Sequence, residues 1–163
     1  MTRLLILSDS HNSQDAIERI LKVEYPNIDA LIFLGDGLRD LELALTHYPK
    51  LRAYAVAGNC DYGALEPLDG LAAFDQVVVF YTHGHMYGVK YDLDTLTDAA
   101  SARGAEVALF GHTHVPVAEQ RGKVFLFNPG SCGRCYTGPN TYGILTLDSG
   151  KVTGYEHKEV PKA

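Results

Sequence analysis

The chain alternates short apolar runs with amphipathic segments through most of its length. Glycine or polar turn residues bound each apolar run, as is typical of strands buried on both faces. The segments between the runs place apolar residues at helical spacing, as at Ile17, Ile20 and Leu21. We therefore predict helices at residues 13–22, 38–47 and 95–104, and strands within residues 3–7, 30–37, 52–61, 73–85, 106–114, 123–131 and 142–157.

The order of these elements predicts the fold class. Strands alternate with helices in the first two thirds of the chain, and the end is rich in strands, with a hairpin at residues 142–157. This order indicates an α/β domain with mixed, layered sheets. No repeat, low-complexity tract or linker interrupts the pattern, so we expect residues 1–163 to form one domain.

Composition narrows the classes of function. The formal net charge is −6 and no run of Lys or Arg occurs, which argues against nucleic acid as a partner. The 46% of apolar and 21% of charged residues are typical of a globular chain. No segment approaches the roughly 20 apolar residues of a membrane span. The N-terminal apolar stretch is too short for a signal peptide, so we expect a cytoplasmic protein with no membrane partner.

The three cysteines are an odd number and too few for a disulfide framework. Cys132 and Cys135 form a CxxC pair, but neither a second pair nor a βα context supports a redox or zinc-ribbon site. We expect reduced thiols in loops.

Potential metal ligands follow five of the apolar runs directly, at Asp9 and His11, Asp36, Asn59, His83, and His112 and His114. The carboxyl ends of strands in an open α/β sheet face one crevice, so these side chains should converge. The glycines beside them allow tight turns and close backbone approach. Each residue alone has a simpler interpretation as a turn or helix-capping residue. Together they favour a metal site, because five of the seven histidines lie in these loops.

The ligand types indicate the kind of metal. Two Asp, one Asn and four His give oxygen and nitrogen ligands without thiolate, which suits Mn²⁺, Fe²⁺, Co²⁺, Ni²⁺ or Zn²⁺ better than Ca²⁺ or Mg²⁺. Seven side chains are too many for one tetrahedral ion but enough for two ions that share a carboxylate. Two ions about 3.5–4 Å apart form the clamp used in phosphoester hydrolysis.

The motifs DSH, GDG, GNCD, HGH and GHTH, in this order and after strands, resemble those of the calcineurin-like metallophosphoesterase family. In particular they are similar to its small single-domain phosphodiesterase branch, which also tends to carry the NPGS found at residues 128–131. Each motif alone is weak, whereas the ordered set is specific. The resemblance covers Ser8 to about Ser131 and implies a four-layer α-β-β-α sandwich with two mixed sheets.

The resemblance also implies a role for each motif residue. One metal ion would be held by Asp9, His11, Asp36 and His114, and a second by Asp36, Asn59, His83 and His112. Asp36 would bridge the two ions, and a water between them would attack phosphorus. Mn²⁺ is the expected metal, and a small phosphodiester is the expected substrate. Asp36, Asn59 and His85 are expected to take a direct part in catalysis.

Three further residues are secondary substrate candidates. Many members of the family have a histidine at the position of Cys60, and that histidine assists the leaving group. The cysteine found here is similar to the small phosphodiesterase branch. A thiol is a poor general acid for an alkoxide, so we expect good activity on aryl diesters and weak activity on alkyl monoesters. Arg134 is either a phosphate-binding cation or an exposed loop residue. The main-chain amides at Gly130 and Ser131 are a candidate anion nest.

The remaining polar residues have simpler interpretations. His85 is a ligand, a neighbour of the ligands or a residue that faces substrate, and Asp61 orients a neighbouring group or closes its turn. His47 and His157 are expected on the surface or in structural roles. The alternative functions are a catalytically silent scaffold for protein assembly, a phosphomonoesterase and a nuclease. A homodimer is also compatible with a domain of this size.

Overall fold

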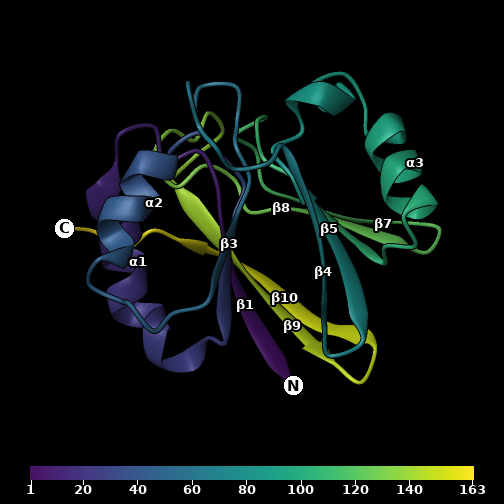
Figure 1. Ribbon diagram of the computed structural model, residues 1–163, viewed down its shortest axis with the longest axis horizontal. Coiled ribbons are helices and arrows are strands. Elements are labelled where there is room, and N and C mark those ends of the chain that lie inside the picture. Colours follow the sequence, from purple (N-terminus) through teal and green to yellow (C-terminus); the bar gives the residue numbers. More distant parts are fainter.

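The computed structural model describes residues 1–163, and its strands form two five-stranded sheets (Figure 1). The first sheet has the strand order β10-β9-β1-β2-β3. Strands β1, β2 and β3 run parallel to one another, while β9 pairs with β1 and β10 antiparallel. The bounds are β1 Thr2–Leu7, β2 Ala30–Phe33, β3 Ala53–Ala55, β9 Thr141–Asp148 and β10 Lys151–Glu159.

The second sheet has the order β4-β5-β6-β8-β7. Its three central strands, β5, β6 and β8, are parallel, and both edge strands pair antiparallel with their neighbours. The bounds are β4 Asp69–Phe74, β5 Val77–Thr82, β6 Val107–Leu109, β7 Val117–Arg121 and β8 Val124–Asn128.

Three helices cover the outer faces of the two sheets. Helices α1 (Gln14–Glu24) and α2 (Leu38–Leu45) lie on the first sheet, and α3 (Asp94–Ala102) lies on the second, on the opposite side of the molecule (Figure 1). Two short 3₁₀ turns complete the elements, η1 at Tyr25–Asn27 and η2 at His85–Tyr87. This arrangement confirms the predicted α-β-β-α layers.

Strand β1 explains why the apolar runs are continuous. Leu4 and Ile6 pack in the core between the two sheets, whereas Leu5 and Leu7 pack in the core beneath α1 and α2. All four side chains are fully buried. A strand with apolar neighbours on both faces needs no alternation of apolar and polar residues.

The predicted β-run at residues 73–85 is wrong in one respect, because the chain reverses within it. Asp75 and Gln76 have positive φ angles of 49° and 67°, and they form the tight turn of a hairpin between β4 and β5. The Asp75-Gln76 pair is not one of the pairs, Asn-Gly or Asp-Gly, that mark such a turn in a sequence. Strand β3 is also shorter than residues 52–61, and the mostly polar strand β7 is absent from the predicted elements.

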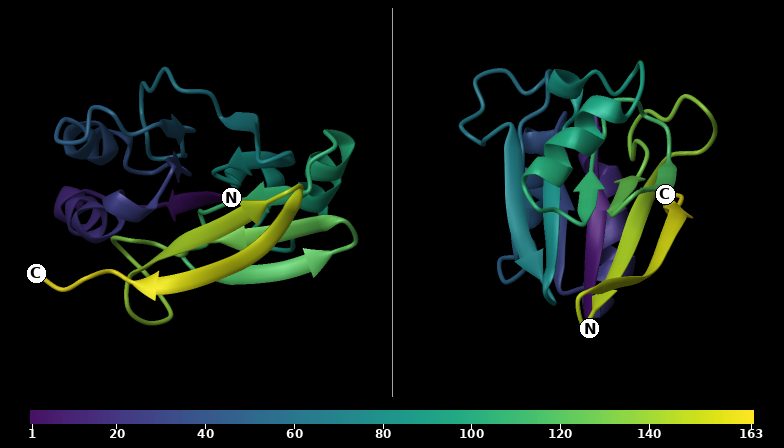
Figure 2. Two further views of the ribbon diagram at one scale, coloured as in Figure 1. Left: turned by 90° about the horizontal axis from the view of Figure 1, so that it is seen from below. Right: turned by 90° about the vertical axis from the view of Figure 1, so that its right-hand side faces the viewer.

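The parallel strands direct the loops that follow them to one end of the molecule. These loops lie at the end of the sheets away from the N-terminus (Figures 1 and 2). The β9–β10 hairpin lies at one edge of the first sheet, and β3 lies at the other edge. None of the helices has the length and apolar character required to cross a membrane.

Candidate metal centre

Five of the seven predicted ligands have left-handed backbone conformations, namely Asp9 (φ 56°), His11 (φ 42°), Asp36 (φ 60°), His112 (φ 69°) and His114 (φ 63°). Positive φ is uncommon for residues other than glycine and costs about 1–3 kcal/mol at each position. Such residues cluster at functional sites, where the surrounding structure holds them in place. The backbone of the loops after β1, β2 and β6 therefore sets the direction of these side chains.

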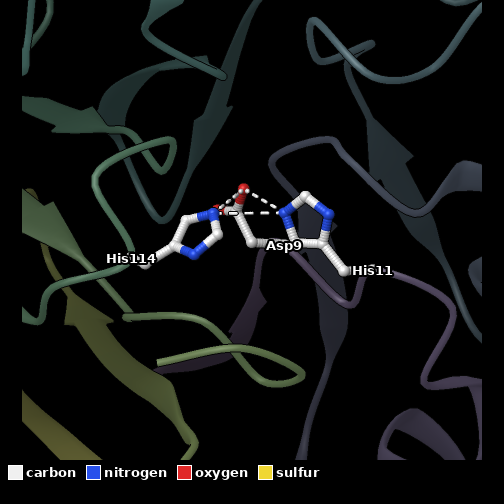
Figure 3. Close-up of side chains that lie close together, drawn as sticks. All are labelled: Asp9, His11 and His114. Atoms are coloured by element: carbon white, nitrogen blue, oxygen red, sulfur yellow. Dashed lines mark hydrogen bonds and ion pairs between the residues drawn. The ribbon is translucent and has the colours of Figure 1, made fainter. Parts of the chain in front are cut away.

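The first cluster joins Asp9, His11 and His114, from the loops after β1 and β6 (Figure 3). Oδ1 of Asp9 lies 3.2 Å from Nε2 of His114 and 3.5 Å from Nε2 of His11. The two imidazole nitrogens are 3.1 Å apart. All three ligand atoms therefore point into one small volume.

The second cluster joins Asp36, His83 and His112, from the loops after β2, β5 and β6. Nε2 of His83 lies 3.3 Å from Oδ2 of Asp36 and 3.2 Å from Nδ1 of His112. Oδ2 of Asp36 is also 3.8 Å from Nε2 of His11. Asp36 thus lies between the two clusters.

An unpaired carboxylate oxygen shows that the first cluster suits a cation. Oδ1 of Asp9 is buried and accepts no hydrogen bond, although Oδ2 accepts the Ser8 hydroxyl and the backbone N–H of His112. Leaving a buried charged oxygen unpaired is costly. A divalent ion among Oδ1 and the facing nitrogens of His11 and His114 would satisfy all three atoms.

Backbone carbonyls set the orientation of two imidazoles. Nδ1 of His83 donates to the carbonyl of Leu34 at 2.7 Å, and Nδ1 of His114 donates to the carbonyl of Arg134 at 2.7 Å. A proton on Nδ1 leaves the lone pair of Nε2 free, and Nε2 is the atom that faces the carboxylates. Histidine ligands in metal sites are oriented in this way.

The electrostatics keep the carboxylates ionised. Burial raises the pKa of Asp9, but the electrostatic attraction of the nearby imidazoles of His11 and His114 outweighs burial, so the net pKa is well below its usual range. The pKa of Asp36 is also lowered, because His83 outweighs burial. Burial, followed by the repulsion that His83 exerts when it is protonated, lowers the pKa of His112 to about 4. Ionised carboxylates and a neutral imidazole are the forms that bind metal.

Glycines bring the loops into contact. A Cβ atom on Gly58 would lie 2.2 Å from Oδ1 of Asp36, and one on Gly111 would lie 2.1 Å from Oγ of Ser8. Gly35 has a φ of 101°, and a Cβ there would lie 2.6 Å from the backbone nitrogen of Gly58. The loops after β2, β3 and β6 therefore approach too closely for any side chain at these positions.

Asp61 closes its turn and orients its neighbours, as the sequence predicts. Its carboxylate accepts backbone N–H groups from two loops, at 2.7 Å from Asp36, 2.9 Å from Gly37, 3.1 Å from Leu38 and 2.8 Å from Gly58. It therefore fixes the backbone of Asp36 and occupies the N-terminus of α2.

Asn59 is exposed, and the single hydrogen bond of its side chain runs from Nδ2 to the Cys60 sulfur at 3.6 Å. Its position as a ligand therefore remains a prediction. The Cys60 thiol lies with His11 and Asp36 in a third group of ligand atoms, all within 4.8 Å of one another. Burial, followed by the Asp36 charge, raises the pKa of this thiol. All three cysteines are free.

His85 lies against the second cluster. Its ring centroid is 5.4 Å from that of His83 and 6.1 Å from that of His112, and its Nδ1 is buried with no hydrogen-bond partner. The other two histidines lie away from the clusters. His47 is exposed beside Glu18, and His157 stacks on Phe127.

Ser131 lies inside its loop. Its side chain is fully buried and donates to the backbone carbonyl of Asp9 at 2.7 Å, and the amide of Gly130 donates to Oδ1 of Asn128. The Gly130 amide is therefore not free for an anion, and the Ser131 hydroxyl holds the loop that carries Asp9. Arg134 is exposed, and its carbonyl positions His114.

Sequence reasoning missed Tyr136. Its ring stacks on the imidazole of His114, with the centroids 4.6 Å apart and the planes at 16°. Tyr136 is itself exposed and lies in an irregular loop. No periodicity or motif marks it, so nothing in the sequence could have identified this contact.

The chain is similar in sequence to known metallophosphoesterases. The model of the calcineurin-like phosphoesterase superfamily domain matches residues 2–150. The probable metallophosphoesterase YsnB of Bacillus subtilis is 35% identical over 153 residues, which cover 92% of this chain and 87% of YsnB. The phosphodiesterase YfcE of Escherichia coli K12 is 33% identical over 178 aligned positions, which cover 91% of this chain and 89% of YfcE.

One solved structure has the same fold at low sequence identity. Vacuolar Protein Sorting 29 from Cryptosporidium parvum superposes with a TM-score of 0.76 over 97% of this chain and 98% of its own, at 14% identity. This likeness concerns the fold alone, because one fold supports several functions. The family model and the two bacterial relatives show that the chain belongs to the calcineurin-like phosphoesterase superfamily and is a metal-dependent phosphoesterase.

Proposed function

We propose that the chain hydrolyses a small phosphodiester at a centre of two divalent ions. The observation that carries the proposal is the buried, unpaired Oδ1 of Asp9, which faces imidazole nitrogens of both His11 and His114. The names of YsnB and YfcE support the reaction class. Divalent ions held here would supply a nucleophilic water at neutral pH and stabilise the charge that develops on the phosphoryl oxygens.

The residues divide between two ion sites. Asp9, His11 and His114 would hold one ion, and His83, His112 and Asn59 the other, with Asp36 shared between them. Asp36 suits the shared role because its Oδ2 lies near imidazoles of both clusters, 3.8 Å from His11 and 3.3 Å from His83. Mn²⁺ is the metal we propose, and Fe²⁺, Co²⁺, Ni²⁺ and Zn²⁺ suit the same ligands.

The chain's own residues would also bind and orient the substrate. His85 lies beside the second cluster, where its imidazole would donate a hydrogen bond to a phosphoryl oxygen of a substrate bound there. Cys60 supplies no imidazolium charge, and its raised pKa makes its thiol a weak acid for an alkoxide. We therefore propose that leaving groups of low pKa, such as phenolates, are preferred.

The test is a panel of aryl and alkyl diesters and monoesters, assayed with each divalent ion in turn. We expect aryl diesters to be the best substrates, and the variant Cys60→His to hydrolyse esters of high leaving-group pKa relatively better. An unchanged dependence on leaving-group pKa in Cys60→His would contradict the role of Cys60. A preference for monoesters in the wild type would favour a phosphomonoesterase.

A silent scaffold for protein assembly is the second candidate, because Vacuolar Protein Sorting 29 has the same fold. A scaffold has no need for strained backbone at metal ligands, yet five of the predicted ligands have positive φ. The ligand set therefore supports the enzyme. A net charge of −6 also argues against a nuclease.

A further inference from the structure

A hollow of about 1020 Å³ opens directly beside the predicted metal centre. One wall carries His11, Asp36 and Cys60, and the rest is formed by the first turns of α2 and by residues 61–66. A phosphodiester has an organic substituent on each side of its phosphorus. A substrate bound at the metal centre would therefore place one substituent in this hollow, which we call the α2 groove.

The α2 groove offers no free helix N-terminus to an anion. Asp61 already accepts the N–H groups of Gly37 and Leu38 at the start of α2. Asp40 is likewise engaged, because its carboxylate accepts the Ser10 hydroxyl at 2.6 Å and the Asn12 backbone N–H at 3.0 Å. The positive end of the helix dipole is therefore neutralised from within the protein.

Side-chain charges make the α2 groove acidic. Beyond the metal ligands its lining holds four carboxylates and one guanidinium, at Asp40, Glu42, Asp61, Glu66 and Arg39. Glu42 and Glu66 are exposed and make no ion pair or side-chain hydrogen bond within the chain. A concave surface on which negative charges outnumber positive ones repels a negatively charged ligand group.

The outer part of the α2 groove is apolar. Tyr62 is 91% exposed and Leu65 is 98% exposed, and both line the hollow. An aromatic ring beside carboxylates suits a cation with apolar character, such as a quaternary ammonium group. An exposed tyrosine also suits a neutral apolar group.

We infer that the α2 groove binds one organic substituent of the diester and selects a cationic or neutral substituent over an anionic one. The inference rests on the proposed function, because it places the scissile phosphodiester at the metal centre. Glu42 and Glu66 are the residues that set the selectivity, and Tyr62 provides the surface on which the substituent packs.

The test uses three p-nitrophenyl diesters that share one leaving group and differ in the second substituent. The substituents are 2-(trimethylammonio)ethyl, its neutral isostere 3,3-dimethylbutyl, and 2-carboxyethyl. At a separation of about 10 Å in water each unit charge changes binding about twofold. The effect has opposite sign on the cationic and the anionic ester, so each unit charge changes the ratio of their kcat/KM values about fourfold. For the net charge of −3 on the lining we therefore expect kcat/KM for the cationic ester to exceed that for the anionic ester at least about tenfold at low ionic strength.

Variants with opposite effects sharpen the test. The double variant Glu42→Lys with Glu66→Lys should lower the cation-to-anion ratio at least about tenfold, while Arg39→Gln should raise it about fourfold. The matched control Glu159→Lys, on β10 at the other edge of the first sheet, should leave the ratio unchanged. A ratio that is the same in the double variant and the wild type would overturn the inference.

A second readout separates this inference from the proposed function. If none of the esters turned over with any divalent ion, the proposed function would be contradicted. Binding of the three corresponding phosphonate analogues to the metal-loaded protein, measured by calorimetry, would then decide the inference. Weaker binding of the cationic analogue in the double variant would support it, and equal binding would overturn it.

Discussion

Nε2 of His114 lies 3.2 Å from Oδ1 of Asp9, although the two residues follow strands of different sheets. The contact requires that the loops after β1 and β6 meet at one end of the sandwich. It also leaves a buried carboxylate oxygen facing imidazole nitrogens with no hydrogen bond to satisfy it. This arrangement suits a positive ion beside Oδ1 of Asp9.

Replacing His114 should remove one ion. We expect His114→Ala to weaken binding of Mn²⁺ at least about 100-fold, more than the effect of removing a residue that only orients a ligand. Hydrolysis of an aryl diester should fall by a similar factor. Calorimetric titration with Mn²⁺ measures the affinity. His47→Ala is the control, because His47 is exposed beside Glu18, and equal losses in both variants would contradict the assignment.

Asp61 should matter for stability and for the position of Asp36. In the wild type the Asp61 carboxylate accepts hydrogen bonds from backbone N–H groups, among them those of Asp36 and Gly58. Asp61→Asn replaces one carboxylate oxygen by an NH₂ group, which cannot accept a hydrogen bond. We expect the free energy of unfolding to fall by about 1–3 kcal/mol. Urea unfolding measures this change. Asp98→Asn, at an exposed position on α3, should have no effect, and a similar loss in this variant would refute the specific role of Asp61.

Tyr136 should stabilise the metal-binding position of His114 through ring stacking. An aromatic contact of this kind is worth about 0.5–1.5 kcal/mol. Tyr136→Ala should therefore weaken Mn²⁺ binding about three- to tenfold, while Tyr136→Phe, which keeps the ring, should retain the wild-type affinity. Tyr91→Ala changes an exposed tyrosine that stacks on no ring and should also retain it. Identical affinity in Tyr136→Ala and the wild type would exclude the role.

Glu24 should make stability depend on pH, independently of the metal centre. Burial raises its pKa, but the ammonium of Lys158 and the hydroxyl of Tyr142 outweigh burial, so the net pKa is lowered. A carboxyl whose pKa is lowered on folding stabilises the protein above its unfolded pKa of about 4.3. This stabilisation disappears as the pH falls through the folded value.

The measurement compares the wild type with Glu24→Gln in urea at several pH values. The wild type should be more stable by about 1–2 kcal/mol at pH 7, and the difference should shrink steadily below pH of about 4.5. Glu159→Gln, at an exposed position, is the control. A difference that stays constant down to pH of about 3 would contradict the lowered pKa.

The sequence predicted the layers, and also the convergence of six of the seven candidate ligands, for the same reason. Runs such as Leu4–Leu7 are apolar throughout because both faces are buried, and a ligand follows directly wherever such a run reaches the site. What the sequence could not reveal depends on contacts between distant residues. Tyr136 stacks on His114, and the buried Ser131 hydroxyl donates to the carbonyl of Asp9. Neither contact is marked by a pattern in the neighbouring sequence. The Asp75-Gln76 turn was missed because its residues are not the usual ones.

The most direct measurement is the number of divalent ions bound per chain, determined by mass spectrometry of the metal after equilibration with Mn²⁺, together with hydrolysis of an aryl phosphodiester by the same sample. The account predicts two ions per chain and hydrolysis that is lost when the ions are chelated and regained when Mn²⁺ is returned. A chain that binds no ion, or that hydrolyses the ester equally well after chelation, would contradict it.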